Sequence, residues 1–249
     1  MAKLFNMATN RQGLIVYGGE ASADFGMVVS EAPTFSQPSR KQKIITVPGR
    51  NGAVIFQEDA WNDVPKKYKV WLAPKGDQSL EDAVSSVMAW LNTQRGYTRL
   101  EDSFAPEIYR LAYYSGGDDF SNELTLYGEA TLSFTCRAEK FYKSGEEAIE
   151  VTNGDQLFNP TRYTSKPLIH IEVASATTVT LAINGVSIVA DVTDYINIDC
   201  ETMNAYRLAS ENKNGDISGT FPTIAPGVNG IGITGTISKA TIVPRYFTI

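Results

Sequence analysis

The sequence has few of the side chains on which metal sites and many active sites depend. It contains one histidine, His170, and two cysteines among 249 residues. No group of His, Cys or carboxylate residues has the spacing of a known metal-binding loop. Glycine-rich phosphate loops and the Gly-x-Ser-x-Gly nucleophile turn are also missing. We therefore expect no metal and no cofactor, and a structural role for His170 within a strand.

Long apolar runs and an excess of positive charge are missing as well. No apolar run approaches the ~20 residues that span a bilayer. Residues 1–6 lack the long apolar core of a secretory signal, so we expect synthesis in a cytoplasm. The sequence has 22 Lys and Arg against 28 Asp and Glu, a net charge of −6. Both halves are mildly acidic, which argues against a nucleic-acid-binding protein.

The two cysteines are Cys136 and Cys200, and neither lies in a Cys-x-x-Cys motif. Cys136 alternates with Phe134 along a predicted strand, and Cys200 follows Ile198 at the same spacing. Each is therefore expected to be a small buried hydrophobe. We favour two free thiols over a disulfide, because the two residues fall in different expected domains.

Residues 79–94 have the clearest helical period in the chain. Their apolar residues recur at every third or fourth position, which gives a single apolar stripe. Ser79 and Asp82 resemble a capping box at the start, and Gly96 is a suitable stop. We predict one amphipathic helix here, packed on a sheet rather than around a cofactor. The stripe comprises Leu80, Ala83, Val84, Val87, Met88 and Leu91.

Short alternating segments typical of β-strands fill most of the remaining first half. In residues 64–73, one face holds Tyr68, Val70 and Leu72, and the other holds lysines and Trp71. Trp71 is then either an ordinary amphipathic surface residue or a subunit contact, because Trp is enriched at interfaces. Further predicted strands are residues 14–17, 25–29, 108–111 and 123–138. The last is either one long strand or a bent pair, with Leu124, Leu126 and Leu132 facing inward.

Residues 144–164 are polar and lack a clear period, so we expect an interdomain linker there. The expected domains are residues 1–150 and 151–249. From residue 166 onward, short β-rich runs alternate with turns, including the strong hairpin signal Asn184-Gly185. This spacing predicts an antiparallel β-sandwich or jelly roll. The predicted fold class is mainly β with one α-helix.

A turn-rich stretch separates two β-rich runs, residues 44–47 and 53–56. Its sequence is Pro48-Gly49-Arg50-Asn51-Gly52. A two-residue type I′ turn at Asn51-Gly52 is one reading; we favour a wide loop, because Pro48 fits poorly inside a paired strand. The result is either an ordinary surface hairpin or a projecting hairpin that grips a neighbouring subunit. The candidate interface residues are Arg40, Lys41, Lys43, Pro48, Gly49, Arg50, Asn51, Gly52 and Trp71.

Several motifs follow one another in a characteristic order. The Pro-Gly-Arg-Asn-Gly turn precedes Trp61 and a Lys-Tyr-Lys-Val strand at residues 67–70. Next come Asp102, Pro106, Tyr109, Arg110, Ala112, Phe134, Cys136, Phe141 and Tyr142. The second half adds Lys166-Pro167, Asn184-Gly185, Ile198-Asp199-Cys200, Phe221-Pro222, Pro226-Gly227-Val228-Asn229 and Pro244-Arg245-Tyr246. Together they resemble the distal tail protein (Dit) family of long-tailed, non-contractile phages, except that Ala138 stands where the family pattern has a proline.

The resemblance implies a virion protein at the phage tail tip. It implies a β-sandwich-like amino-terminal domain that forms a hexameric ring, and a galectin-like carboxy-terminal sandwich. Such a ring joins the tail tube protein to the tail-associated hub protein and to the receptor-binding proteins of the baseplate. The tape-measure protein and the genome DNA pass through its lumen without specific binding, and a mildly acidic protein suits such a conduit because it repels phosphate.

Two other functions remain to be weighed against a structural ring. The carboxy-terminal sandwich alone could be a carbohydrate-binding module that contacts host saccharides, although its candidate aromatics Tyr195, Tyr206 and Tyr246 are scattered. A polymer hydrolase would need a carboxylate pair such as Asp199 and Glu201. These two acids share a strand face and are expected in water with Cys200 inward, so we expect no enzyme.

Overall fold

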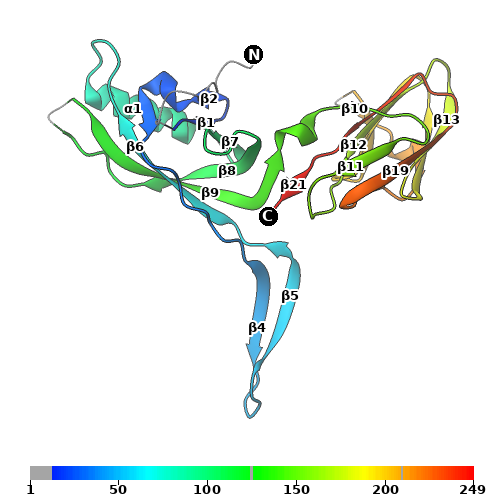
Figure 1. The fold of residues 1–249 in the computed structure, drawn as a ribbon, viewed down its shortest axis with the longest axis horizontal. Coiled ribbons are helices and arrows are strands. Elements are labelled where there is room, and N and C mark those ends of the chain that lie inside the picture. Colours follow the sequence, from blue (N-terminus) through cyan, green and yellow to red (C-terminus); the bar gives the residue numbers. More distant parts are fainter. Residues whose placement is uncertain (1–12, 124–125, 209) are drawn as a thin grey trace. The chain divides into compact units, whose positions relative to one another are not determined.

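The protein is mainly β-structure with one α-helix in its described part, as the sequence predicts. A computed structural model describes residues 13–123, 126–208 and 210–249 and is drawn in Figure 1. The chain divides into two compact units, the first ending at Lys140 and the second spanning Phe141–Thr248. This division precedes the expected boundary at residue 150.

The first unit is built around one curled sheet, in which the path of strands runs β2-β1-β7-β8-β9-β6-β3. The chain just before β1 returns to the opposite edge of this sheet, because Gly13 and Val29 exchange two backbone hydrogen bonds of 3.0 and 2.7 Å. The sheet therefore curls toward closure around a core. Its strands are β1 (Ile15–Tyr17), β2 (Glu20–Ala21), β3 (Met27–Val29), β6 (Val64–Leu72), β7 (Thr98–Asp102), β8 (Ile108–Gly117) and β9 (Gly128–Tyr142).

The predicted helix is confirmed as α1 (Leu80–Thr93). Ser79 caps it, accepting the Asp82 N–H at 3.1 Å, as the capping box predicts. Trp90, which the predicted stripe omits, is also buried and donates its indole N–H to the Tyr17 carbonyl at 3.0 Å. Among the described residues, no helix combines the length and the apolar character needed to cross a bilayer.

Phe25 does not lie in a strand, contrary to the prediction for residues 25–29. It ends a 3-10 helix (Ser22–Phe25) and stacks on Trp90 with ring centroids 4.7 Å apart. Gly26 follows with φ +73°, a left-handed conformation that interrupts extended backbone. The strand β3 therefore begins only at Met27.

The prediction of a strand over residues 123–138 is correct only in part. Strand β9 begins at Gly128 and continues to Tyr142. Before it, the Glu123 N–H donates to the Tyr127 carbonyl at 3.0 Å, which closes a turn. Leu126 lies in that turn and is 70% exposed, so its predicted inward orientation is wrong. Leu124 lies outside the described residues.

The second unit is a sandwich of two antiparallel sheets around one apolar core. Asn184 and Gly185 both have positive φ in the tight turn between β13 and β14, as the hairpin signal predicts. The six-stranded sheet orders β10 (Ile149–Glu150), β20 (Lys239–Val243), β12 (Leu168–Glu172), β15 (Tyr195–Asp199), β16 (Asn204–Arg207) and β17 (Glu211–Asn212). The five-stranded sheet orders β11 (Gln156–Asn159), β19 (Gly227–Thr234), β13 (Thr177–Ile183), β14 (Val186–Val192) and β18 (Ile217–Gly219).

Residues 144–164 are not a linker; they belong to the sandwich. They carry β10 and β11, which pair with β20 and β19 at the edges of the two sheets. A short edge strand is exposed to water on one side. Its polar residues therefore obscure the apolar–polar alternation by which a strand is recognised in the sequence. The 3-10 helices Lys143–Glu146 and Asn214–Asp216 and the last strand β21 (Phe247–Thr248) complete this part of the described chain.

Candidate functional site

Two strands of the first unit pair only with each other. Strands β4 (Arg40–Thr46) and β5 (Ala53–Trp61) form a separate two-stranded sheet, and every residue of β4 is exposed. Figure 1 shows this pair as an arm that leaves the remainder of the first unit. We call residues 40–61 the arm. It contains all the sequence-predicted interface residues except Trp71, and its strands are longer than the predicted runs at 44–47 and 53–56.

The tip of the arm is the wide loop favoured by the sequence. The Arg50 N–H donates to the Val47 carbonyl at 3.2 Å across Pro48 and Gly49. Gly49 has φ +79°, so Pro and Gly occupy the positions that a type II turn requires. A type I′ turn would also need positive φ at Asn51, which Asn51 does not have. Arg50 is exposed at this tip.

Apolar side chains lie on both faces of the arm. Ile44 pairs across the strands with Ile55 on one face, and Ile45 pairs with Val54 on the other, next to Phe56. Five large apolar side chains of the arm are between 38% and 57% exposed: Ile44, Ile45, Val47, Ile55 and Phe56. A two-stranded hairpin without a third element is marginally stable in water, and contiguous exposed apolar surface is typical of interaction sites.

Three of the arm's four cationic residues lie on β4, and the fourth, Arg50, lies at the tip. At its base, the Arg40 guanidinium lies 4.6 Å from the Trp61 ring centroid and 3.9 Å from the Asp59 carboxylate. Lys41, Lys43 and Arg50 have no ion pair with any described residue, and all three are exposed. Residues 42–57, the outer part of the arm, therefore carry apolar and cationic side chains and no acid.

Trp71 lies on the outward face of β6, as its alternation with buried residues predicts, and is 46% exposed. It stands across from Val28 of β3 and Glu129 of β9. Two adjoining hollows of about 420 Å³ each share Trp71 and Glu129, and we call them together the Trp71 groove. Their other principal lining residues are Gly26, Ser30, Glu31, Lys69, Ala73, Asp118, Asp119, Tyr127 and Thr131.

The structure does not bring Trp71 together with the arm of the same chain. The arm joins β6 at the Val64 end, and Trp71 lies seven residues along that strand. Seven extended residues span about 23 Å. The sequence also missed Asp118, Asp119 and Tyr127 as groove residues, because two acids after two glycines indicate only a turn.

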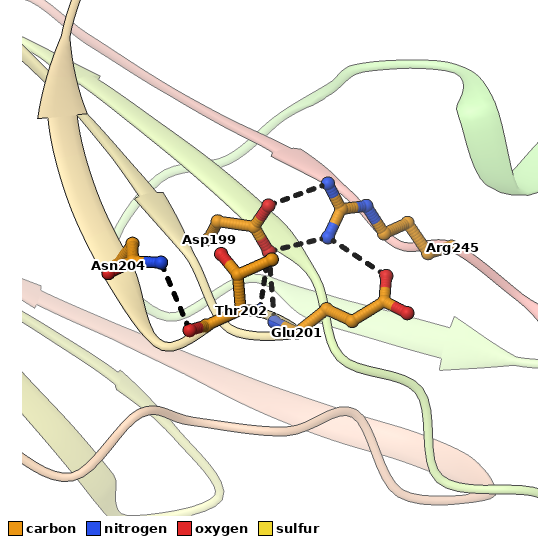
Figure 2. A network of polar contacts seen from close by, with 5 residues as sticks. All are labelled: Asp199, Glu201, Thr202, Asn204 and Arg245. Carbon is orange, nitrogen blue, oxygen red and sulfur yellow. Dashed lines mark hydrogen bonds and ion pairs between the residues drawn. The ribbon is translucent and has the colours of Figure 1, made fainter. Parts of the chain in front are cut away.

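The carboxylate pair of the second unit is not arranged for catalysis. The Arg245 guanidinium donates to both Asp199 oxygens, at 2.6 and 3.1 Å, and to a Glu201 oxygen at 3.5 Å. Figure 2 shows this network. Asp199 also accepts the backbone N–H groups of Glu201 and Thr202. The prediction that both acids face water is wrong for Asp199, which is buried beneath the arginine.

This environment fixes the charge of Asp199. Burial opposes the charged carboxylate, but hydrogen bonds from Arg245 and Glu201 outweigh it and lower the Asp199 pKa. A glycosidase general acid needs a raised pKa so that it can hold a proton. The pair of Asp199 and Glu201 is therefore a structural ion-pair network.

His170 is held on both sides by polar neighbours. Its Nδ1 lies 2.8 Å from the Asn197 side-chain oxygen and its Nε2 lies 2.9 Å from a Glu172 carboxylate oxygen. Both ring nitrogens of His170 therefore have polar partners on the six-stranded sheet. Over the described ranges, no group of three His, Cys, Asp or Glu side chains is placed to hold a metal ion.

The fold matches solved phage structures over almost its whole length. No protein-family model and no curated protein sequence matches the chain. The chain resembles the SPP1 Dit protein in fold. The alignment covers 95% of this chain and 99% of that protein, with a TM-score of 0.69 and 13% identity. The SPP1 Dit protein is described as a paradigm of the hub adsorption apparatus in phages that infect Gram-positive bacteria.

A second solved structure agrees with the first. It is a chain of the phage p2 baseplate in its activated conformation with Sr. The alignment covers 94% of this chain and 97% of the baseplate chain. Its TM-score is 0.53 and its identity is 11%. At these identities the likeness establishes the fold. It confirms the resemblance to distal tail proteins that the motif order indicates.

Proposed function

We propose that the protein is a structural distal tail protein of a long-tailed, non-contractile phage. Six copies form a ring that joins the tail tube to the tail-tip hub and to the host-adsorption proteins. The observation that carries this proposal is the fold similarity to the SPP1 Dit protein, which covers both chains almost completely. The first unit builds the ring. The second unit is a galectin-like sandwich and serves as an attachment module in the same virion assembly.

The exposed arm supports a ring built by head-to-tail contacts. In such a ring one surface patch meets a different patch on the next copy, and the rotation closes. Fully burying one large apolar side chain stabilises a contact by roughly 1.5–3 kcal/mol, whereas an exposed ion pair contributes about 0–1 kcal/mol. Exposed apolar side chains of the arm, such as Ile45 and Phe56, therefore supply most of the stabilisation of the contact, and the arm's lysines fix its register.

The proposed partners are the tail tube protein on one side of the ring, and the hub and receptor-binding proteins on the other. The tape-measure protein and then the genome DNA pass through the lumen. A net charge of −6 per chain disfavours adhesion of DNA phosphates to the wall. In this proposal the protein joins other tail proteins as a structural ring and catalyses no reaction.

Replacing residues 48–52 by a short Gly-Ser link tests the role of the arm in assembly. We expect the ring to be lost in sedimentation velocity while the second unit keeps its thermal unfolding transition. Arg50→Glu serves as the milder variant, since its single charge should weaken assembly less and its effect should fade in high salt. A loop-replaced protein that assembles into the same ring with unchanged stability would show that the arm is not the subunit contact.

A further inference from the structure

We propose that the Trp71 groove of one copy receives the arm of the next copy. The inference rests on the proposed ring, and it adds the surface on which the arm docks. Its occupant is a second copy of this chain, identified by complementary charge, by apolar surface on both partners and by the separation of arm and groove within one chain.

The groove offers an aromatic floor beside acidic walls. Trp71 and Tyr127 are 46% and 42% exposed at its apolar end. Asp118, Asp119 and Glu129 line the adjoining end and have no ion pair with any residue that the structure describes.

The one lysine in the groove does not neutralise these acids. Lys69 is paired with Glu31 at 2.9 Å. Three uncompensated carboxylates therefore border exposed aromatic surface, a combination that fits an apolar and cationic partner.

The arm presents the matching chemistry on one face. Lys43 and Phe56 are cross-strand partners, and Ile45 and Val54 form the next pair on the same face. The opposite face pairs Gln42 with Gln57 and Ile44 with Ile55, so these pairs carry no charge. The Lys43 face can therefore place apolar side chains on Trp71 and Tyr127 while the Lys43 ammonium group reaches the carboxylates of the groove.

The position of the groove requires a second copy. The arm leaves β6 at the Val64 end, and Trp71 lies at the other end of that strand. An arm that fills another copy's groove joins two different patches, which is the head-to-tail contact that builds a closed ring. Like charges would oppose arm-to-arm or groove-to-groove pairing, so the charges also select this arrangement.

A charge exchange between arm and groove tests the inference. Lys43→Glu and Glu129→Lys should each raise the protein concentration needed for half-assembly by about tenfold, because each places like charges together. The double variant Lys43→Glu with Glu129→Lys should recover most of the loss. Glu107→Lys is the matched control, an exposed acid of the first unit outside the groove, and should leave assembly unchanged.

Disulfide trapping tests the contact directly, whatever the substitutions do to stability. Ile45→Cys protein mixed with Tyr127→Cys protein should give a cross-linked dimer under mild oxidation, since both native cysteines are buried. Ile44→Cys, on the other arm face, should cross-link more slowly, and Phe158→Cys in the second unit should not cross-link to Ile45→Cys.

The outcomes separate this inference from the proposed function. If the wild-type chain does not assemble, the proposed ring is wrong and the inference falls with it. If it assembles and the loop replacement abolishes assembly, yet Glu129→Lys and Trp71→Ala assemble normally and Tyr127→Cys does not cross-link, the ring stands. The arm then docks elsewhere, and the inference is overturned.

Discussion

Arg245 binds Asp199 through both terminal nitrogens of its guanidinium, at 2.6 and 3.1 Å, across 46 positions of sequence. This contact ties the end of β15 to the segment after β20. Because Asp199 is buried, removing either partner would leave a charge without its counter-ion and would destabilise the fold.

Arg245→Met should therefore destabilise the second unit. We expect a loss of about 2–3 kcal/mol in the free energy of unfolding, because Asp199 would keep its buried charge and lose two charge-assisted hydrogen bonds. Urea unfolding of the variant measures the loss. Glu201→Gln is the control, since Glu201 is exposed and should change stability by less than about 0.5 kcal/mol. Equal stability of Arg245→Met and the wild type would contradict the role of the pair.

The lowered pKa of Asp199 predicts a pH dependence of stability. A group whose pKa is lower in the folded state contributes stability above its unfolded pKa of about 4, and loses it as pH falls through the folded value. The difference in Tm between the wild type and Asp199→Asn should be largest above pH 5 and shrink below pH 4. A difference that stays constant from pH 6 to pH 3 would show that Asp199 is not linked to folding in this way.

Both cysteines should be silent in the native protein and reactive after unfolding. Cys136 and Cys200 are free and buried, and burial raises their pKa values to about 11 and about 12. The reactive thiolate is therefore scarce at pH 8. A thiol-specific chromogenic reagent should detect two thiols in denaturant and almost none without it. A rapid native reaction would contradict the burial, and a missing thiol in denaturant would reveal a disulfide.

Trypsin should cut the free subunit first in the arm. Lys41, Lys43 and Arg50 are exposed on a two-stranded hairpin that can open locally at little cost. Residues 144–164, which carry β10 and β11, should resist longer. Mass spectrometry of early fragments identifies the sites, and assembled protein should be cut in the arm more slowly. A first cut within residues 144–164 would contradict their place in the sandwich.

The sequence predicted elements whose signals are local. The helix α1 follows from an apolar stripe and a Ser79 cap, and the arm follows from turn residues that need unusual backbone angles. Asn184-Gly185 likewise determines its own hairpin. In each case the residues that decide the structure lie within a few positions of one another.

The parts that were missed depend on residues far away in the chain. Trp90 lies at the margin of the helical stripe and is buried because Phe25 and Tyr17 cover that side. Asp199 lies on a strand face that would meet water, until Arg245 covers it. The Trp71 groove forms because β3, β6 and β9 lie side by side, and no local sequence pattern predicts that pairing.

Native mass spectrometry of the purified wild-type chain, over a series of protein concentrations, shows whether six copies form a ring. We expect a species of six times the 27.2 kDa chain mass, or stacked multiples of it, whose population grows with protein concentration. The loop-replaced protein should remain at the mass of one chain under the same conditions. A wild-type chain that stays monomeric up to its highest soluble concentration would contradict the proposed ring.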